Sequence, residues 1–131
     1  MEKAMERRLL IIDTEEFDRN MMGRIFSSTY EMAYAACIED AGKVMQEFKP
    51  GVVYFEVRCT DTGQFTAVAD AMATYCPQSS LIVAVSDNSR EFERFIRSRE
   101  VFYYMLRPFN LKELWDAVES GFNVFEKKHG L

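Results

Sequence analysis

The sequence has few of the residues that build metal centres, disulfide frameworks or histidine-based catalysis. Its 131 residues include three cysteines and one histidine. A tetrahedral zinc site needs about four nitrogen and sulfur ligands, so we expect no zinc. Cys37, Cys59 and Cys76 are odd in number and lack CxxC spacing, which predicts reduced and mostly buried thiols. Because His129 lies close to the last residue, a Ser/His/Asp or Cys/His nucleophile set is excluded.

Long apolar runs and an excess of basic residues are also missing. The longest apolar run near the start, Leu9–Ile12, is far shorter than the ~20 residues that span a bilayer. Residues 1–8 lack the apolar stretch of a signal peptide, so we expect a cytoplasmic chain without a membrane partner. Sixteen Lys and Arg against 21 Asp and Glu give a net charge of −5. That sign argues against nucleic acid as a partner, because phosphate binding needs a basic face.

Glycine and proline are scarce, with six and three residues, and they fall between regular segments. The stretch after the first apolar run, Asp13–Phe17, contains no glycine and is acidic. A nucleotide or flavin phosphate is held by bare backbone N–H groups of a glycine-rich loop. The sequence therefore argues against a nucleotide or flavin cofactor.

Five apolar runs alternate with five helical patterns along the chain. The runs lie near residues 8–12, 30–36, 52–56, 81–85 and 101–105, and the helical patterns cover residues 16–27, 38–48, 64–75, 90–99 and 111–125. Strands that are apolar throughout are typical of a parallel sheet covered on both faces, and right-handed crossovers leave few topologies. We predict one α/β domain over residues 1–131, a flavodoxin-like doubly wound (βα)5 sandwich with strand order 2-1-3-4-5.

The residues that follow the strands of such a sheet meet at one edge, where ligands bind. Here they are acids, hydroxyls and one cation: Asp13, Thr14, Glu15, Glu16, Glu56, Ser86, Asp87 and Arg107. The cluster could hold a hard divalent metal through its oxygens. It could equally form a salt-bridged polar edge, and spacing alone leaves both interpretations open.

Four motifs follow one another in order along the chain. They are Leu10–Asp13, Lys49–Glu56, Leu81–Ser86 and Tyr104–Leu114. Together they resemble the receiver domain of two-component response regulators over essentially the whole chain. The resemblance implies transfer of a phosphoryl group from a kinase histidine to an aspartate that ends the third strand. It also implies an acidic pair after the first strand that helps to hold Mg²⁺.

The site departs from that family pattern at several matched positions. Glu56 stands in place of the phosphorylated aspartate, Thr14 replaces the second acid after Asp13, and Arg107 replaces a lysine. The extra methylene of Glu displaces its carboxylate, and an error of ~1 Å in near-attack geometry can cost ~100-fold in rate. Arginine favours bidentate pairing with a carboxylate. We therefore predict a permanent ion pair between Glu56 and Arg107.

Other matched positions complete the candidate site. Ser86 matches the family's hydroxyl, and Tyr104 matches the aromatic that repositions on activation. Asp87 follows Ser86 where the family prefers a small residue, and we expect it to be a further partner of Arg107. Glu15 adds to the acidic pocket.

These departures predict a receiver-like domain that is not an enzyme and acts as a phosphorylation-independent protein-interaction module. The expected partner is a sensor histidine kinase or an output protein, bound through helix 90–99, strand 101–105 and helix 111–125; a homodimer is the alternative. We expect no cofactor, and at most weak Mg²⁺ binding by Asp13, Glu56 and the backbone of Arg58. Two alternatives stay open: a working receiver phosphorylated on Glu56 or Asp61, and a flavodoxin-like module unrelated to phosphorelay.

Overall fold

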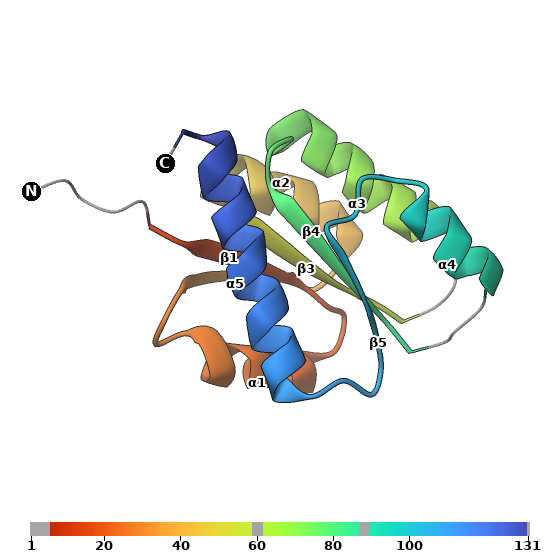
Figure 1. Cartoon of the computed structure of the whole chain (residues 1–131), viewed down its shortest axis with the longest axis horizontal. Coiled ribbons are helices and arrows are strands. Elements are labelled where there is room, and N and C mark those ends of the chain that lie inside the picture. The colour runs from red at the N-terminus through yellow and green to blue at the C-terminus, as the bar shows by residue number, and fades with distance from the viewer. Residues whose placement is uncertain (1–5, 59–61, 87–89, 131) are drawn as a thin grey trace, which may run out of the picture.

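The computed structural model describes residues 6–58, 62–86 and 90–130, and within them strands and helices alternate strictly (Figure 1). In chain order the elements are β1 (Arg8–Ile12), α1 (Glu16–Phe26), β2 (Glu31–Ala35), α2 (Ile38–Phe48), β3 (Val52–Val57), α3 (Thr62–Tyr75), β4 (Ser80–Val85), α4 (Arg90–Arg97), β5 (Tyr103–Leu106) and α5 (Leu111–Lys128). All strand pairs are parallel, in the order β2-β1-β3-β4-β5. The predicted fold class and strand order are confirmed.

Helices cover both faces of the sheet, which is why its central strands are apolar throughout. Every residue of β3 and β4 is buried. Successive strand side chains point to opposite faces: Val53 and Phe55 pack with α2, α3 and α4, whereas Val52 and Tyr54 pack with α1 and α5. In Figure 1, α5 crosses one face of the sheet, and α2 and α3 lie behind it. The same alternation decides on which face each polar side chain at the strand ends emerges.

The third strand is longer than predicted, and this changes the place of Glu56. Val57 pairs with Val85 of β4, and Glu56 pairs with Ala84. Glu56 therefore lies inside β3 rather than at its end, and its backbone is held in the pairing with β4.

The fifth strand begins at Tyr103 rather than at residue 101, which corrects the predicted bound. The N–H of Val101 donates to the carbonyl of Arg99 at 2.9 Å, which closes a turn. Regular pairing with β4 starts with Tyr103 opposite Ile82. The last helix also extends beyond the predicted residue 125, to Lys128, and the basic side chains of its last turn favour a helix C-terminus. The remaining bounds agree to within two residues.

Two further sequence predictions have partial outcomes. Cys76 is buried and Cys37 is half-buried, both as free thiols, whereas Cys59 lies outside the described residues. In the part of the chain that the structure describes, no helix has the length and apolar character needed to cross a membrane.

Candidate functional site

The carboxyl edge of the sheet brings together residues from three strands. Ile12 lies opposite Phe55 in the β1–β3 register, so the next residues, Asp13 and Glu56, stand side by side. Arg107 follows β5, and its N–H donates to the carbonyl of Val85 at 2.9 Å. Strand alternation directs Asp13, Glu56 and Arg107 to the face that α1 and α5 cover.

The carboxylate of Glu56 is completely buried and its hydrogen bonds come from two side chains. Arg107 donates from Nε to Oε2 at 2.9 Å and from Nη2 to Oε1 at 2.7 Å. The hydroxyl of Tyr54, two residues earlier on the same face of β3, donates to Oε1 at 2.7 Å. The side chain of Glu56 is 0% exposed and that of Arg107 is 36% exposed. The predicted ion pair between Glu56 and Arg107 is confirmed.

The electrostatics of this group favour the protonated forms of the two donors, Arg107 and Tyr54. The hydrogen bond to Glu56 raises the pKa of Arg107 above its usual value, and the charge of Glu56 adds to this. Burial raises the pKa of Tyr54, and the neighbouring Glu56 carboxylate raises it further. The guanidinium carbon of Arg107 also lies 4.8 Å from the centre of the Phe109 ring, so an aromatic face also stabilises the cation.

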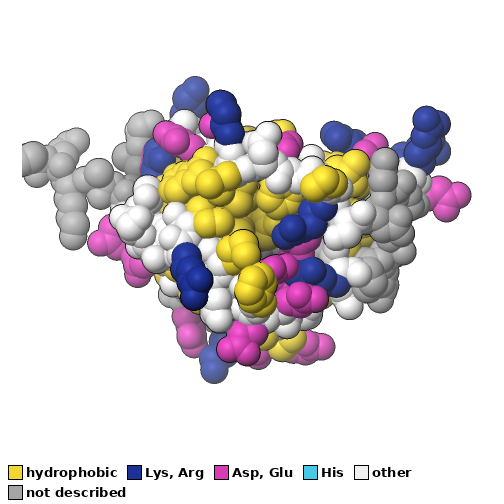
Figure 2. All heavy atoms as spheres, turned by 90° about the horizontal axis from the view of Figure 1, so that it is seen from below, with side chains coloured by type: hydrophobic (Ala, Val, Ile, Leu, Met, Phe, Trp, Pro, Cys, Tyr) yellow, Lys and Arg dark blue, Asp and Glu magenta, His cyan; other side chains and the backbone are white. Residues whose placement is uncertain are grey.

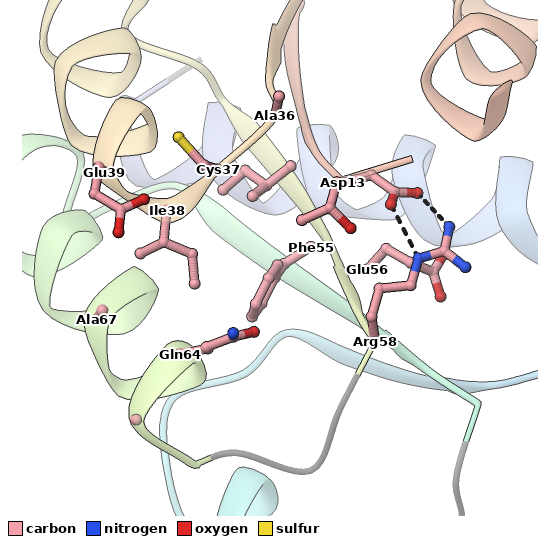
Figure 3. A pocket seen from close by; sticks show the side chains of 13 residues that line it. Asp13, Ala36, Cys37, Ile38, Glu39, Phe55, Glu56, Arg58, Gln64 and Ala67 are labelled. Carbon is pink, nitrogen blue, oxygen red and sulfur yellow. Dashed lines mark hydrogen bonds and ion pairs between the residues drawn. The ribbon is translucent and has the colours of Figure 1, made fainter. Parts of the chain in front are cut away.

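A second ion pair lies beside the first, between Asp13 and Arg58. Arg58 donates from Nε to Oδ1 of Asp13 at 3.1 Å and from Nη2 to Oδ2 at 2.9 Å. Oδ1 also accepts the backbone N–H of Glu15 at 3.0 Å. In Figure 3 the guanidinium of Arg58 points towards Asp13 and away from Cys37. The hydrogen bond to Asp13 raises the pKa of Arg58, while partial burial acts in the opposite direction.

Sequence reasoning missed the side chain of Arg58 and the whole of Asp18. Arg58 was expected to offer only its backbone, yet the period of two that places Tyr54 and Glu56 on one face places Arg58 there as well. Asp18 lies in the first turn of α1 and accepts a hydrogen bond from Nη2 of Arg58. Asp18 also lies 4.0 Å from Nη2 of Arg107, so one carboxylate joins the two ion pairs.

The other predicted site residues lie further from this centre. Thr14 and Ser86 are exposed, and Thr14 lines a pocket together with Asp13 and Glu56. Tyr104 is partly buried against the core that α2, α3 and α4 cover, and the guanidinium carbon of Arg97 lies 5.0 Å from its ring centre. Asp87, the expected further partner of Arg107, lies outside the described residues.

The edge is hollowed on both faces of the sheet. A pocket of about 490 Å³ opens between the starts of α2 and α3 (Figure 3). A smaller pocket of about 210 Å³ lies between α1 and the start of α5. Asp13 and Glu56 line both pockets, so their ion pairs form the wall between the two hollows.

The Mg²⁺ that the resemblance implies does not fit the residues at this edge. Mg²⁺ needs carboxylate oxygens in near-octahedral geometry. Both oxygens of Asp13 are bonded to Arg58, and both oxygens of Glu56 are bonded to Arg107. Thr14 contributes no charge at the second acidic position. Over residues 6–58, 62–86 and 90–130, no three His, Cys, Asp or Glu side chains are arranged to hold a metal ion. Weak Mg²⁺ binding would have to displace these guanidinium groups.

No protein-family model matches this chain, and no curated protein matches it. Solved structures do. A CheY-like response regulator receiver domain from Methanospirillum hungatei JF-1 is 18% identical, with a TM-score of 0.83 over 95% of this chain and 99% of that one. A response regulator receiver domain from Clostridium thermocellum is 15% identical, with a TM-score of 0.80 over 95% and 99%. The beryllofluoride-activated NtrC4 receiver domain dimer is 19% identical, with a TM-score of 0.77 over 90% and 98%. The chain therefore has the receiver-domain fold, as the sequence resemblance implied.

Proposed function

We propose that this chain is a receiver-like domain of two-component signalling that binds a protein partner without being phosphorylated and has no catalytic activity of its own. One observation carries the proposal: the carboxylate of Glu56, at the phosphoacceptor position, is buried and held by Arg107 and Tyr54. The receiver-domain fold supports the signalling context. The burial and hydrogen bonding of the Glu56 carboxylate support the proposal that this residue is not phosphorylated.

Phosphoryl transfer needs a carboxylate oxygen with a free lone pair that faces the incoming phosphorus in line. A carboxylate offers about four acceptor positions, and three of those on Glu56 are filled by strong, charge-assisted hydrogen bonds. The anchoring of Glu56 within β3 prevents a small shift of the backbone from freeing the carboxylate. The remaining position is on Oε2, which is buried and bound to Arg107, so an attack on phosphorus would first have to expose and reorient a carboxylate that this pair holds.

The test is incubation of the chain with Mg²⁺ and acetyl phosphate, followed by intact mass measurement. We expect no phosphoryl adduct on the wild-type chain. A near-stoichiometric adduct would overturn the proposal, and Glu56→Gln would then locate it. Loss of the adduct in Glu56→Gln would assign it to Glu56. Its persistence would assign it to another acid, such as Asp61, which lies outside the described residues.

The partner surface that we propose is the face of α4, β5 and α5. β5 is an edge strand of the sheet, and its Tyr103 and Leu106 are each 37% exposed. The hydroxyl of Tyr103 donates to Glu113 of α5 at 3.0 Å, which ties the strand to the helix. Since the NtrC4 receiver domain forms a dimer, a second copy of this chain is the first partner to test.

A second exposed apolar area lies on α1 and the start of α5, so the location of the partner surface can be tested by comparing the two areas. Figure 2 looks onto the side where α1 and the start of α5 lie, and hydrophobic side chains gather there beside acidic and basic ones. Phe17 and Met21 of α1 are 70% and 44% exposed, and Leu111 of α5 is 54% exposed. Exposed apolar area of this kind marks interaction surfaces. The surface of α1 is therefore the alternative binding site to the surface around β5.

Leu106→Asp and Phe17→Asp separate the two surfaces, because each places one charge on one exposed apolar position. Sedimentation velocity of the wild-type chain and both variants reports self-association. We expect Leu106→Asp to weaken it and Phe17→Asp to leave it unchanged. The reverse pattern would move the binding surface to α1, and a wild-type monomer would exclude the homodimer and leave a kinase or an output protein as the partner.

A further inference from the structure

One guanidinium group lies at the meeting point of three carboxylates. Nη2 of Arg58 donates to Oδ2 of Asp13 at 2.9 Å and also to Oδ2 of Asp18. Nη1 of Arg58 lies 3.7 Å from Oε1 of Glu15. A single nitrogen therefore joins the end of β1 to the first turn of α1, in the way that a bound cation bridges two carboxylates.

The carboxylates around Arg58 need a positive charge close by. The side chain of Asp13 is 1% exposed and that of Asp18 is 23% exposed, so water screens Asp13 poorly. An uncompensated buried carboxylate is strongly destabilising, and neighbouring like charges add to that cost. Glu56 stands beside Asp13 and already has Arg107, so Asp13 depends on Arg58 for its counter-charge, and Asp18 has Arg58 as its nearer cation.

We infer that Arg58 is the permanent counter-ion of Asp13 and Asp18 and that it excludes divalent cations from the carboxyl edge of the sheet. The inference deepens the proposed function and rests on it, because a domain that is not phosphorylated has no need of Mg²⁺ for that chemistry. It agrees with Thr14 at the second acidic position, because each further carboxylate would add negative charge that the single guanidinium of Arg58 could not balance. On this inference, the arrangement of Asp13, Asp18 and Arg58 does not depend on the Mg²⁺ concentration.

The raised pKa of Arg58 agrees with this role, since its hydrogen bond to Asp13 is the largest cause of the increase. The guanidinium keeps its charge across the whole range in which proteins are folded. Unlike a metal ion, it is covalently attached through β3 and cannot be removed by a chelator. Arg58 is therefore a positioning residue that holds Asp13 and α1 in place.

The test compares Mg²⁺ binding by the wild-type chain, Arg58→Met and Arg58→Lys. Thermal unfolding is followed with MgCl2 and with NaCl of matched ionic strength, because a ligand of the native state raises the unfolding temperature. We expect no Mg²⁺-specific shift for the wild-type chain or for Arg58→Lys, which keeps the charge. We expect Arg58→Met to unfold at a lower temperature and to regain part of the loss with Mg²⁺. Its Mg²⁺ affinity should exceed that of the wild type by about tenfold or more, because a unit charge within ~4 Å is among the largest influences on cation affinity.

Arg19→Met is the matched control, because Arg19 donates to the backbone carbonyl of Asp13 at 2.7 Å rather than to its carboxylate. It removes the same charge from the same neighbourhood, and we expect it to gain no Mg²⁺ binding. An equal gain of Mg²⁺ binding in Arg19→Met would show that the loss of any nearby positive charge is sufficient, and it would overturn the inference.

A Mg²⁺-specific shift of the wild-type chain would overturn the inference directly and needs no variant to fold. If Arg58→Met is unfolded, Arg58→Gln takes its place, and a folded variant that gains no Mg²⁺ binding would also overturn the inference. The proposed function fails on a different result, an acetyl phosphate adduct of the wild-type chain. The two failures are therefore distinguishable.

Discussion

The two ion pairs at the carboxyl edge have the same chemistry and different surroundings. Glu56 lies inside β3, paired with Ala84 of β4, and its donors are Arg107 and the Tyr54 hydroxyl. Asp13 follows the end of β1, and its donors are Arg58 and a backbone N–H. Arg107 serves chiefly one acid, whereas Arg58 is shared with Asp18.

This difference predicts which of the two carboxylates can move towards water when its guanidinium partner is removed. Asp13 lies outside β1, in the short connection to α1, so we expect its side chain to turn towards water more easily. Glu56 lies within β3, where it pairs with Ala84 of β4, and has less freedom. A buried charge left without its partner costs more than the intact pair contributes, so the more constrained acid should give the larger effect.

Arg107→Met should therefore produce the largest loss of stability. It leaves the Glu56 carboxylate buried with the Tyr54 hydroxyl as its remaining side-chain donor, and breaking such a pair costs about 3–5 kcal/mol. The free energy of unfolding from urea titration, followed by circular dichroism, measures the effect.

The double variant Glu56→Gln, Arg107→Met is the control for that loss. Removing both charges should recover most of the stability, because the penalty comes from the orphaned carboxylate rather than from the missing pair. If the double variant is as unstable as Arg107→Met alone, lost packing of Arg107 on Phe109 is the cause instead.

Arg58→Met should cost less, about 2–3 kcal/mol without Mg²⁺. Asp13 keeps the N–H of Glu15 as a donor and can move towards solvent. Urea titration under the same conditions ranks this variant against Arg107→Met. A loss larger than that of Arg107→Met would reverse the comparison and make Asp13 the more constrained acid.

Tyr54→Phe should cost about 1.5 kcal/mol, the low end for a hydrogen bond to a charged group. Glu56 keeps both hydrogen bonds from Arg107, so its carboxylate is not orphaned. The ring of Tyr54 is buried, and phenylalanine preserves its packing. An unchanged free energy of unfolding would show that the hydroxyl contributes nothing beyond the Arg107 pair.

Tyr54→Phe should also change how the free energy of unfolding depends on pH in the alkaline range. Burial raises the pKa of Tyr54 in the folded chain, and Glu56 adds to the increase. Above pH ~10 an unfolded tyrosine loses its proton while folded Tyr54 keeps it, so stability falls as the pH rises. Tyr54→Phe should flatten that fall by up to about 1.4 kcal/mol per pH unit. Tyr30 and Tyr103, whose pKa values are also raised, should keep part of the slope.

These two ion pairs also separate what the sequence could predict from what it could not. Strand order follows from apolar runs and crossover handedness, and the Glu56–Arg107 pair follows from two strand ends meeting at one edge. Arg58 was missed because its charge lies just beyond a strand, where a polar residue is ordinary, and its partner Asp13 lies 45 residues away. Asp18 was missed because only the helix position directs its carboxylate back towards the edge.

The bounds of β3 and β5 also show what the sequence could not predict. β5 starts late because a local turn at Val101 and the carbonyl of Arg99 compete with sheet pairing, and an apolar run carries no sign of that competition. The inclusion of Glu56 within β3 depends on pairing with β4. The first feature arises from a local turn and the second from a contact distant in sequence, and periodicity reports neither.

Lys112→Ala should have the smallest effect and completes the ranking. Lys112 and Asp116 form an i,i+4 pair at 2.6 Å on α5, but their side chains are 84% and 62% exposed. Water and salt screen such a pair, and ordering two long side chains offsets the attraction. The distance is as short as those at Glu56, so distance alone would rank this pair equally. We expect no measurable change in the urea midpoint, and a loss comparable to that of Tyr54→Phe would show that burial does not separate the edge pairs from the surface pair.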